Sequence, residues 1–213
     1  TGQQTKLMLH GKPYTLDIPL VGGFQVMNIL AALGLSVAVG ADMEKALSVV
    51  GKFKGVPGRL EHVATLANGA SVYVDYAHTP MALANILQTL RPHTKTKLHV
   101  VFGCGGDRDA GKRPEMGKAA VKLADHVIIT DDNPRSERPE LIRAAIKAAA
   151  PTAKEVADRK EAIYVALQLL EPNDILVIAG KGHEKTQIVG SQVLPFDDVE
   201  VARQAAKELK LAA

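Results

Sequence analysis

The sequence is poor in cysteine, in aromatic residues and in long apolar runs. It has one cysteine, no tryptophan, and four residues each of tyrosine and phenylalanine among 213 residues. A single cysteine excludes an internal disulfide and suits a reducing compartment. The apolar runs are far shorter than a membrane span, and no signal peptide opens the chain. We therefore expect a cytoplasmic protein that does not enter a membrane.

Neither sign of charge dominates the sequence. Lysine and arginine total 26 and aspartate and glutamate total 23, which gives a net charge of +3. The basic residues are scattered among acidic ones, so the sequence indicates no nucleic-acid partner. Hydrophobic residues make up 46% of the chain and charged residues 23%, a mixture that can build a sizeable core.

The first quarter of the sequence predicts a hairpin and two helices. Residues 5–20 alternate around a central turn, which is typical of paired strands. Residues 24–40 form an apolar, Ala-rich helix, and a second helix is expected over 42–53. The segment 54–61 breaks this pattern with two glycines and a proline. We place a domain boundary there, between domains 1–57 and 58–213.

From Arg59 onward, expected strands alternate with expected helices. Several of these strands are almost wholly apolar, which is typical of a parallel sheet covered on both faces. The sequence therefore predicts an α/β, Rossmann-like fold with a mostly parallel sheet and helices on both faces, preceded by a partial second domain. The expected strands are 71–77, 97–102, 126–130, 154–157 and 174–180. The expected helices are 80–92, 114–124, 140–150, 159–170 and 198–211, the last preceded by a short ribbon.

Polar side chains follow four of these strands at the point where each strand ends. Ligands of such sheets bind beyond the carboxyl ends of the strands. Because these ends lie at one edge of a parallel sheet, we expect the four polar clusters to form the ligand site. The clusters are Asp75 with His78, Asp107 with Arg108, Asn133 with Arg135, and Lys181 with Glu184.

The second of these loops contains most of a phosphate-binding P-loop. Residues 106–112 match G-x-x-x-x-G-K, but Arg113 stands where the motif needs Ser or Thr to hold Mg²⁺. Pro114 suits the first turn of a helix, so we expect the helix to begin there and Lys112 to precede it. The loop is better interpreted as one that presents Arg108 to a smaller anion. A solvated, flexible loop is the plain alternative.

Five separated motifs together resemble those of the Mur ligases, the ATP-dependent enzymes that build the peptide stem of bacterial peptidoglycan. The motifs agree with that family in order and spacing, and the resemblance runs from about Ile18 to the end of the chain. They are PGRLE (57–61), YVDYAHTP (73–80), GCGGDRDAGKRPEMG (103–117), TDDNPRSERP (130–139) and AGKGHE (179–184).

The resemblance implies the end of the family's central ATPase domain followed by its C-terminal Rossmann-like domain. The family's own P-loop and main Mg²⁺ ligands are absent from this sequence, so we expect this part alone to be inactive. The implied reaction uses ATP and Mg²⁺ to phosphorylate a carboxylate of UDP-MurNAc-L-Ala-D-Glu, and the amine of an amino acid then displaces phosphate. We expect a monomer. No residue of the chain is assigned as a catalytic base or as a metal ligand.

The DNPR motif, Asp132–Arg135, marks by resemblance the family members that add meso-diaminopimelate and not lysine. Pro134 stiffens the loop, and an arginine fork matches a carboxylate in two-pronged fashion. Lysine would leave buried arginines without a partner, which costs about 3–5 kcal/mol and implies discrimination on the order of 10³-fold. The resemblance implies a meso-diaminopimelate pocket made by Arg108, Asn133, Arg135, Gly180 and Glu184.

The resemblance also implies three contacts with ATP: Asn28, Arg59 and Asp75. Asp75 ends an expected strand, where a carboxylate can accept hydrogen bonds from ribose hydroxyls. Arg59 lies at the expected hinge between the domains. Gln25 stands where the family usually has asparagine, and it keeps an amide on a longer arm.

Two other functions are left as alternatives. The first is a Rossmann-like module that binds an anionic metabolite without chemistry of its own. The second is an NAD(P)-dependent oxidoreductase, because residues 103–106 superficially resemble a dinucleotide loop, although G-x-G-x-x-G is absent. We expect Cys104 to be present for its small size and Lys181 to be solvated. His78 and His183 are not assigned to a metal, since no second ligand stands at a suitable spacing.

Overall fold

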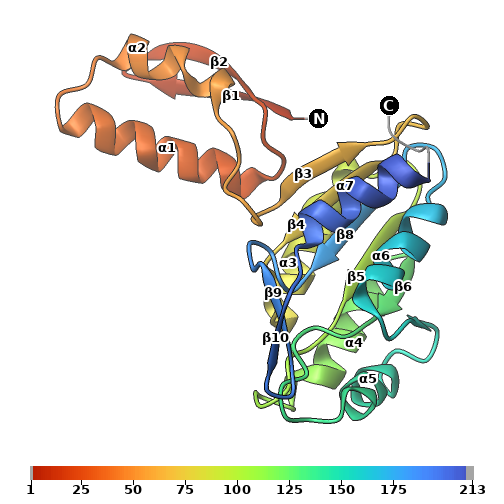
Figure 1. Cartoon of the computed structure of the whole chain (residues 1–213). Coiled ribbons are helices and arrows are strands. Elements are labelled where there is room, and N and C mark those ends of the chain that lie inside the picture. The colour runs from red at the N-terminus through yellow and green to blue at the C-terminus, as the bar shows by residue number, and fades with distance from the viewer. Residues whose placement is uncertain (1, 210–213) are drawn as a thin grey trace. The chain divides into compact units, whose positions relative to one another are not determined.

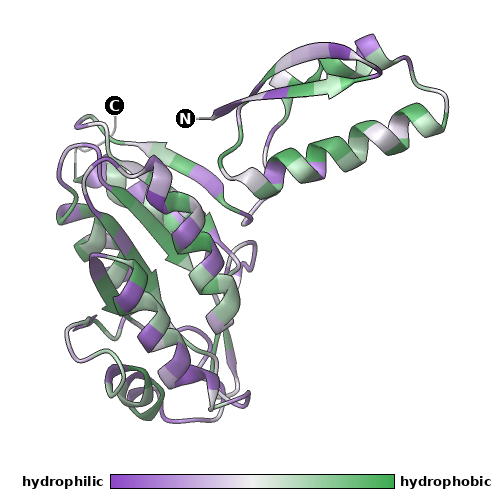
Figure 2. Cartoon of the chain, turned by 180° about the vertical axis from the view of Figure 1, so that it is seen from behind, coloured by the Kyte–Doolittle hydropathy of each residue, from purple (hydrophilic) through white to green (hydrophobic). Residues whose placement is uncertain are grey.

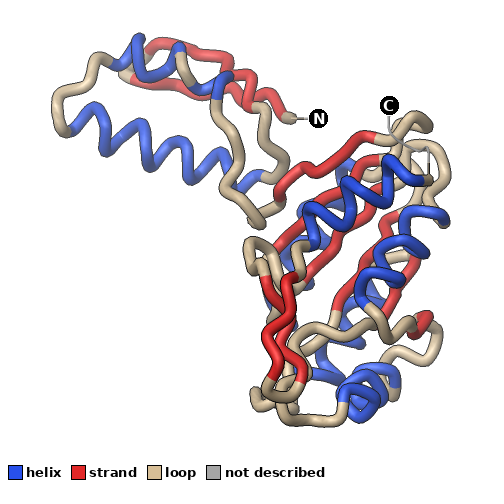
Figure 3. The backbone as a smooth tube through the Cα atoms, viewed as in Figure 1, coloured by secondary structure: helices blue, strands red, loops and turns tan. Residues whose placement is uncertain are grey.

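The computed structural model describes residues 2–209, and the chain divides into two compact units (Figure 1). The first unit ends at Gly55 and the second begins at Val56, two residues before the boundary that the sequence predicts. Each unit has its own strands, helices and apolar core, and the trace in Figure 3 shows the two sets of elements.

The first unit opens with an antiparallel hairpin of β1 (Gln3–Leu9) and β2 (Lys12–Ile18). His10 and Gly11 form its turn, with φ angles of 48° and 77°. A two-residue turn with both φ angles positive matches the right-handed twist of paired strands. The hairpin that the sequence predicts is confirmed.

Two helices and a small core complete the first unit. α1 (Gly23–Ala38) is followed by α2 (Met43–Ser48) and one 3₁₀ turn (Val50–Lys52), so the predicted second helix is split in two. Asp42 is the N-cap of α2: its carboxylate accepts a hydrogen bond from the backbone nitrogen of Lys45 at 2.8 Å. The core consists of Leu16, Ile18, Ile29, Leu33, Leu47 and Val50.

The second unit is built on a six-stranded sheet with the order β3-β4-β8-β5-β6-β7. β3 is antiparallel to β4, and the other neighbours pair in parallel. The sequence analysis missed β3, in which only Val63 is buried. The strands are β3 (Glu61–Thr65), β4 (Ser71–Asp75), β5 (Leu98–Phe102), β6 (His126–Ile129), β7 (Lys154–Glu155) and β8 (Ile175–Ala179).

Helices cover both faces of this sheet, as Figure 1 shows. α3 (Pro80–Leu90), α4 (Lys112–Leu123) and α5 (Pro139–Lys147) pack side by side on one face. α6 (Arg159–Gln168) and α7 (Asp198–Glu208) pack together on the other. The predicted α/β architecture, a mostly parallel sheet between two helical layers, is confirmed.

The central strands are buried along their whole length. Every residue of β5 and β8 is buried, and Figure 2 shows the strands inside the second unit mostly in the green of hydrophobic residues. β8 lies between β4 and β5, although it is the last of the six strands along the chain. As a result, the loops that follow β4, β8, β5 and β6 begin at one edge of the sheet. A short ribbon of β9 (Thr186–Val189) and β10 (Gln192–Pro195) follows β8.

None of the helices within residues 2–209 is long and apolar enough to cross a membrane.

A fully buried ion pair joins α6 to α7. Arg159 and Asp198 each have a side chain with 0% exposure. Nε and Nη2 of Arg159 donate to the two carboxylate oxygens of Asp198, both at 2.7 Å, and Nη2 also donates to the carbonyl of Ala179 at 3.0 Å. Desolvation alone would lower the pKa of Arg159, but the adjacent Asp198 carboxylate outweighs burial and raises it.

We expect Asp198→Ala to lower the free energy of unfolding by about 3–5 kcal/mol, because it leaves the Arg159 charge buried without its partner. Replacing both residues by apolar ones, Arg159→Met with Asp198→Leu, is expected to cost less than the single change. Denaturant titration followed by circular dichroism measures both values. Glu171→Ala removes the exposed ion pair with Lys97 and is the control, with little change expected. A double variant as unstable as the sum of its single variants would contradict this account.

Candidate functional site

Two loops meet at the carboxyl edge of the sheet, the glycine loop after β5 (residues 103–109) and the DNPR loop after β6 (residues 131–137). A Cβ atom on Gly103 would lie 2.3 Å from the carbonyl oxygen of Thr130, and one on Gly106 would lie 1.9 Å from that of Pro134. Both distances are too short for any side chain. Backbone packing between the loops therefore requires these glycines. The glycine-rich loop is explained by this packing and not by binding of a triphosphate.

Backbone hydrogen bonds hold these two loops together. The amide of Gly106 donates to the carbonyl of Asn133 at 2.9 Å, and Nη1 of Arg135 donates to the carbonyl of Gly106 at 2.8 Å. The amide of Arg135 donates to the carbonyl of Ile188 in β9 at 3.0 Å, and its carbonyl accepts from Gly190 at 2.7 Å. The DNPR loop is thus bound on one side to the glycine loop and on the other to the ribbon.

Asp107 adds a side-chain connection between the same loops. Its carboxylate accepts from the hydroxyl of Ser136 at 2.6 Å and from the backbone nitrogen of Ser136 at 3.1 Å. These hydrogen bonds lower the pKa of Asp107. The backbone nitrogen of Asp107 donates to Glu137 at 2.6 Å, and Glu137 in turn accepts two hydrogen bonds from Arg113. Side-chain hydrogen bonds therefore join the two loops in addition to the backbone ones.

The two arginines that the sequence assigns to the pocket both have side-chain atoms near Gly105. A Cβ atom built there would be 2.8 Å from Nη1 of Arg135 and 3.9 Å from Cγ of Arg108. Arg108 is exposed and Arg135 is half-buried. The expectation that lysine would leave two buried arginines unpaired is therefore wrong for Arg108. The discrimination between the two amino acids stays a prediction.

Asn133 links the DNPR loop to the loop after β8. Its side chain is buried, and Nδ2 donates to Oε2 of Glu184 at 3.0 Å. Oδ1 accepts from Nζ of Lys181 at 2.7 Å and from the backbone nitrogen of Ile188 at 3.0 Å. The side chain of Glu184 is 33% exposed, so part of it faces solvent. Asn133 thus connects the DNPR loop to Lys181 and Glu184 of the loop after β8.

The expected solvent exposure of Lys181 is wrong. Its side chain is fully buried, whereas the sequence analysis expected a solvated lysine. Burial lowers the pKa of its ammonium group, and the nearby carboxylates of Asp132 and Glu184 oppose that shift. Its place between Gly180 and Gly182, directly after a wholly apolar strand, was the sequence signal for a tightly packed position.

Gly180 has a structural reason to be glycine. Its φ angle is +117°, which L side chains rarely adopt, and a Cβ atom there would lie 2.8 Å from Oδ2 of Asp132 in the DNPR motif. Gly180 therefore stands beside the same loop as the other pocket residues. Its contribution to a ligand site is the space that it leaves for this loop.

Of the three residues assigned to ATP, Arg59 and Asp75 lie near each other in the second unit, whereas Asn28 belongs to the first. Asp75 is buried, and its two carboxylate oxygens accept from the backbone nitrogens of Leu60 and Ala77, each at 2.7 Å. Desolvation raises the pKa of Asp75, and these two hydrogen bonds oppose the shift. Arg59 lies over the ring of Tyr76 at 4.6 Å. Asn28 belongs to the first unit, where it is exposed and donates to Oε1 of Gln25 at 3.4 Å.

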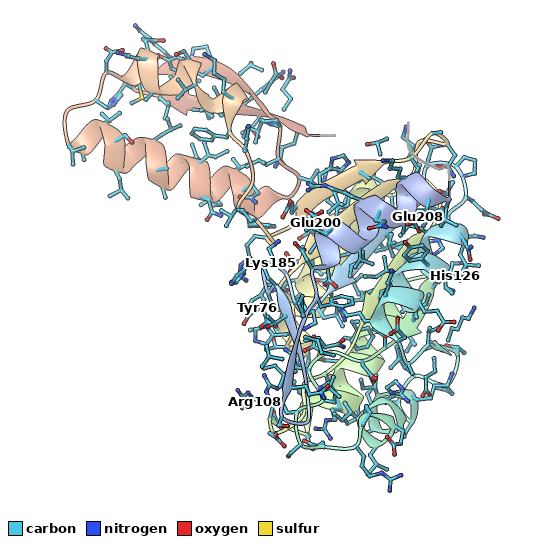
Figure 4. All side chains as sticks on the ribbon, viewed as in Figure 1. Tyr76, Arg108, His126, Lys185, Glu200 and Glu208 are labelled. Carbon is cyan, nitrogen blue, oxygen red and sulfur yellow. The ribbon has the colours of Figure 1, made fainter. Side chains whose placement is uncertain are left out.

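Tyr76 is a feature that the sequence analysis did not single out. Besides Arg59, its ring contacts the rings of His78 and His183, with centroids 4.5 Å and 5.2 Å apart. Figure 4 shows Tyr76 along the same side of the second unit as Arg108. The two histidines thus have aromatic partners, and within residues 2–209 no group of three or more His, Cys, Asp or Glu is placed to hold a metal ion.

Lys112 and Cys104 complete the glycine loop. α4 begins at Lys112, so the expectation that this lysine precedes the helix is wrong. Its Nζ donates to the carbonyl of His78 at 2.8 Å. Cys104 is buried, and burial raises the pKa of its thiol to about 12. A thiol that stays protonated at neutral pH is not a nucleophile.

Comparison with protein-family models shows which family the chain belongs to. The family model of the "Mur ligase, glutamate ligase domain" matches residues 58–182, more than half of the chain. The chain belongs to the Mur ligase family. The matched range includes the glycine and DNPR loops and Gly180, and it ends just before Glu184.

Among known proteins, this Mur ligase chain is similar to UDP-N-acetylmuramoyl-L-alanyl-D-glutamate--2,6-diaminopimelate ligases. It is 53% identical to that of Mesorhizobium japonicum over 206 residues, covering 97% of this chain and 43% of the relative. It is 56% identical to that of Bradyrhizobium diazoefficiens over 195 residues, covering 92% and 40%. A solved structure of such a ligase matches with a TM-score of 0.75 and 40% identity, covering 97% of this chain and 43% of that one. The chain thus spans less than half the length of these relatives.

We expect Gly106→Ala to separate the two loops, since the added methyl group would meet the carbonyl of Pro134 at 1.9 Å. Overpacking of this kind destabilises by about 1–3 kcal/mol. Gly34→Ala is the matched control: Gly34 lies inside α1 with nothing within 4 Å of an added Cβ, and alanine there is expected to stabilise by about 0.5–1 kcal/mol. Thermal unfolding of both variants measures the difference. Equal stability of Gly106→Ala and the unchanged protein would contradict the close packing.

Proposed function

We propose that this chain is the amino-acid-binding part of an ATP-dependent ligase that joins meso-diaminopimelate to UDP-MurNAc-L-Ala-D-Glu in peptidoglycan synthesis. The observation that supports the proposal is the hydrogen bond from Asn133 of the DNPR loop to Glu184, with Nη1 of Arg135 and the stem of Arg108 near Gly105. The printed names of the similar ligases, which specify 2,6-diaminopimelate, support the same substrate.

The chemistry of the pocket suits the far end of diaminopimelate. That end carries an ammonium group and a carboxylate, whereas lysine has the ammonium group alone. Guanidinium groups bind a carboxylate through two parallel hydrogen bonds, so Arg108 and Arg135 are suited to the carboxylate. Glu184 keeps an exposed portion and is suited to the ammonium group. Gly180 leaves room for the DNPR loop beside them.

In this reaction, the role of the chain is to bind and position the substrates. ATP supplies the phosphoryl group that activates the side carboxylate of D-glutamate, and the amine of diaminopimelate then attacks the acyl group and releases phosphate. Arg59 is exposed and is suited to a phosphate, whereas the Asp75 oxygens already hold backbone amides and leave less capacity for a ribose. Asn28 is the third proposed ATP contact. Proximity and orientation are proposed to carry much of this chain's contribution.

The two compact units fit this function. The second unit is the proposed amino-acid-binding domain, and the first is proposed to be the end of the family's central ATPase domain. We propose that the enzyme works in the cytoplasm as a monomer.

The complete ligase is expected to use meso-diaminopimelate in preference to L-lysine. Hydrogen bonds to charged groups contribute about 1.5–3 kcal/mol, so kcat/KM for lysine is expected to be lower by roughly 10- to 100-fold or more. The measurement is release of phosphate with each amino acid at varied concentration. Equal kcat/KM values would refute the proposed substrate, and binding of meso-diaminopimelate without any turnover would favour the binding module.

Arg135→Ala is expected to raise the KM for meso-diaminopimelate by roughly 10- to 100-fold, since it removes a charged hydrogen-bond donor. The KM for ATP is expected to change little. Arg138→Ala is the control, because Arg138 lies three residues away with a side chain 73% exposed and pairs with Glu140. A selective effect of Arg135→Ala on ATP would instead assign the DNPR loop to the nucleotide.

A further inference from the structure

The buried ammonium group of Lys181 is used by no step described so far. It follows β8 directly, its side chain has 0% exposure, and its Nζ donates to Oδ1 of Asn133 at 2.7 Å and to the carbonyl of Thr186 at 2.8 Å. The same Nζ lies 3.7 Å from Oε2 of Glu184. A lysine side chain is rarely placed out of contact with water, because burial of its charge is unfavourable.

Lys181 fixes the orientation of the Asn133 amide. An ammonium group and a backbone N–H can only donate hydrogen bonds. Lys181 and the backbone nitrogen of Ile188 both face one end of this amide, so that end must be the oxygen. The amide nitrogen then faces Oε2 of Glu184. Turning the amide over would set its NH₂ against two donors and its oxygen against a carboxylate, which loses all three hydrogen bonds.

The orientation of Asn133 in turn positions Glu184. Oε2 of Glu184 accepts from Asn133 and lies near Lys181, while the side chain remains 33% exposed. A glutamate on a loop would otherwise sample several rotamers. With one oxygen held, the rest of the carboxylate is presented to the ligand site in one place.

We propose that Lys181 is a positioning residue for the amino-acid site: through Asn133 it holds Glu184 where the distal ammonium group of the substrate binds. This inference rests on the proposed function, and it adds to the site a residue that does not touch the ligand. Specificity for a diamino diacid then depends on the hydrogen bonds that link Lys181 through Asn133 to Glu184, as well as on the arginines.

The test is Lys181→Met in the complete ligase, with the KM for meso-diaminopimelate and for ATP measured side by side. Loss of one hydrogen-bonded arrangement of this kind is expected to raise the KM for meso-diaminopimelate about tenfold and to leave the KM for ATP unchanged. Lys185→Met is the matched control, since Lys185 is exposed on the same segment and pairs with Asp197. An equal rise in both KM values would mean a general structural effect and would overturn the inference.

A double-mutant cycle with Asn133→Ala separates positioning from general packing. If Lys181 acts through Asn133, Lys181→Met is expected to cause no further rise in the KM for meso-diaminopimelate in the Asn133→Ala background. Additive effects would overturn the inference. Should Lys181→Met fail to fold, Asn133→Asp serves in its place. It keeps an acceptor for Lys181 but turns a second carboxylate toward Glu184, so about tenfold weaker binding with an intact fold is expected, and unchanged binding would overturn the inference.

A measurement without ligand distinguishes this inference from the proposed function. In ¹⁵N-labelled protein, the side-chain amide protons of Asn133 are expected to exchange slowly with water and to exchange much faster in Lys181→Met. Exchange at equal rates would overturn the orienting contact itself. If the exchange behaves as expected but the unchanged ligase does not bind meso-diaminopimelate, the proposed function is refuted, and with it the role of Lys181 toward that ligand.

Discussion

Backbone atoms of two loops approach each other at the carboxyl edge of the sheet so closely that only glycine can stand between them. Gly103 and Gly106 leave no space for a Cβ atom beside Thr130 and Pro134. This steric constraint decides where the arginines of both loops emerge. Since β9 pairs with the other side of the DNPR loop, three segments that are far apart in sequence form one hydrogen-bonded rim.

Within this rim, the buried ammonium group of Lys181 orients the Asn133 amide and is not expected to stabilise the fold. A buried lysine beside a neutral amide gives up hydration that its hydrogen bonds only partly replace. The consequence is geometric: the Asn133 amide has one permitted orientation, and one oxygen of Glu184 accepts a hydrogen bond from it. Such preorganisation lowers the cost of ordering side chains when a ligand binds.

Much of the fold follows from the sequence, whereas the environments of the residues assigned to the site do not. Apolar runs of strand length and the glycine–proline breaks predict the alternating elements, and motif order predicts which loops carry the site. β3 (Glu61–Thr65) was missed because a single buried residue gives no period. Lys181 was misjudged and Arg108 was taken as buried, because burial is set by the neighbouring loops. The start of α4 was missed because Pro114 is tolerated inside the first turn.

The most direct measurement is a crystal structure of the complete ligase with meso-diaminopimelate bound. This account expects the distal carboxylate between the guanidinium groups of Arg108 and Arg135, at about 2.7–2.9 Å from their nitrogen atoms, with the distal ammonium group at Glu184. If that end of the ligand lies elsewhere, or if nucleotide phosphates occupy the space around Gly105, the central claim is contradicted.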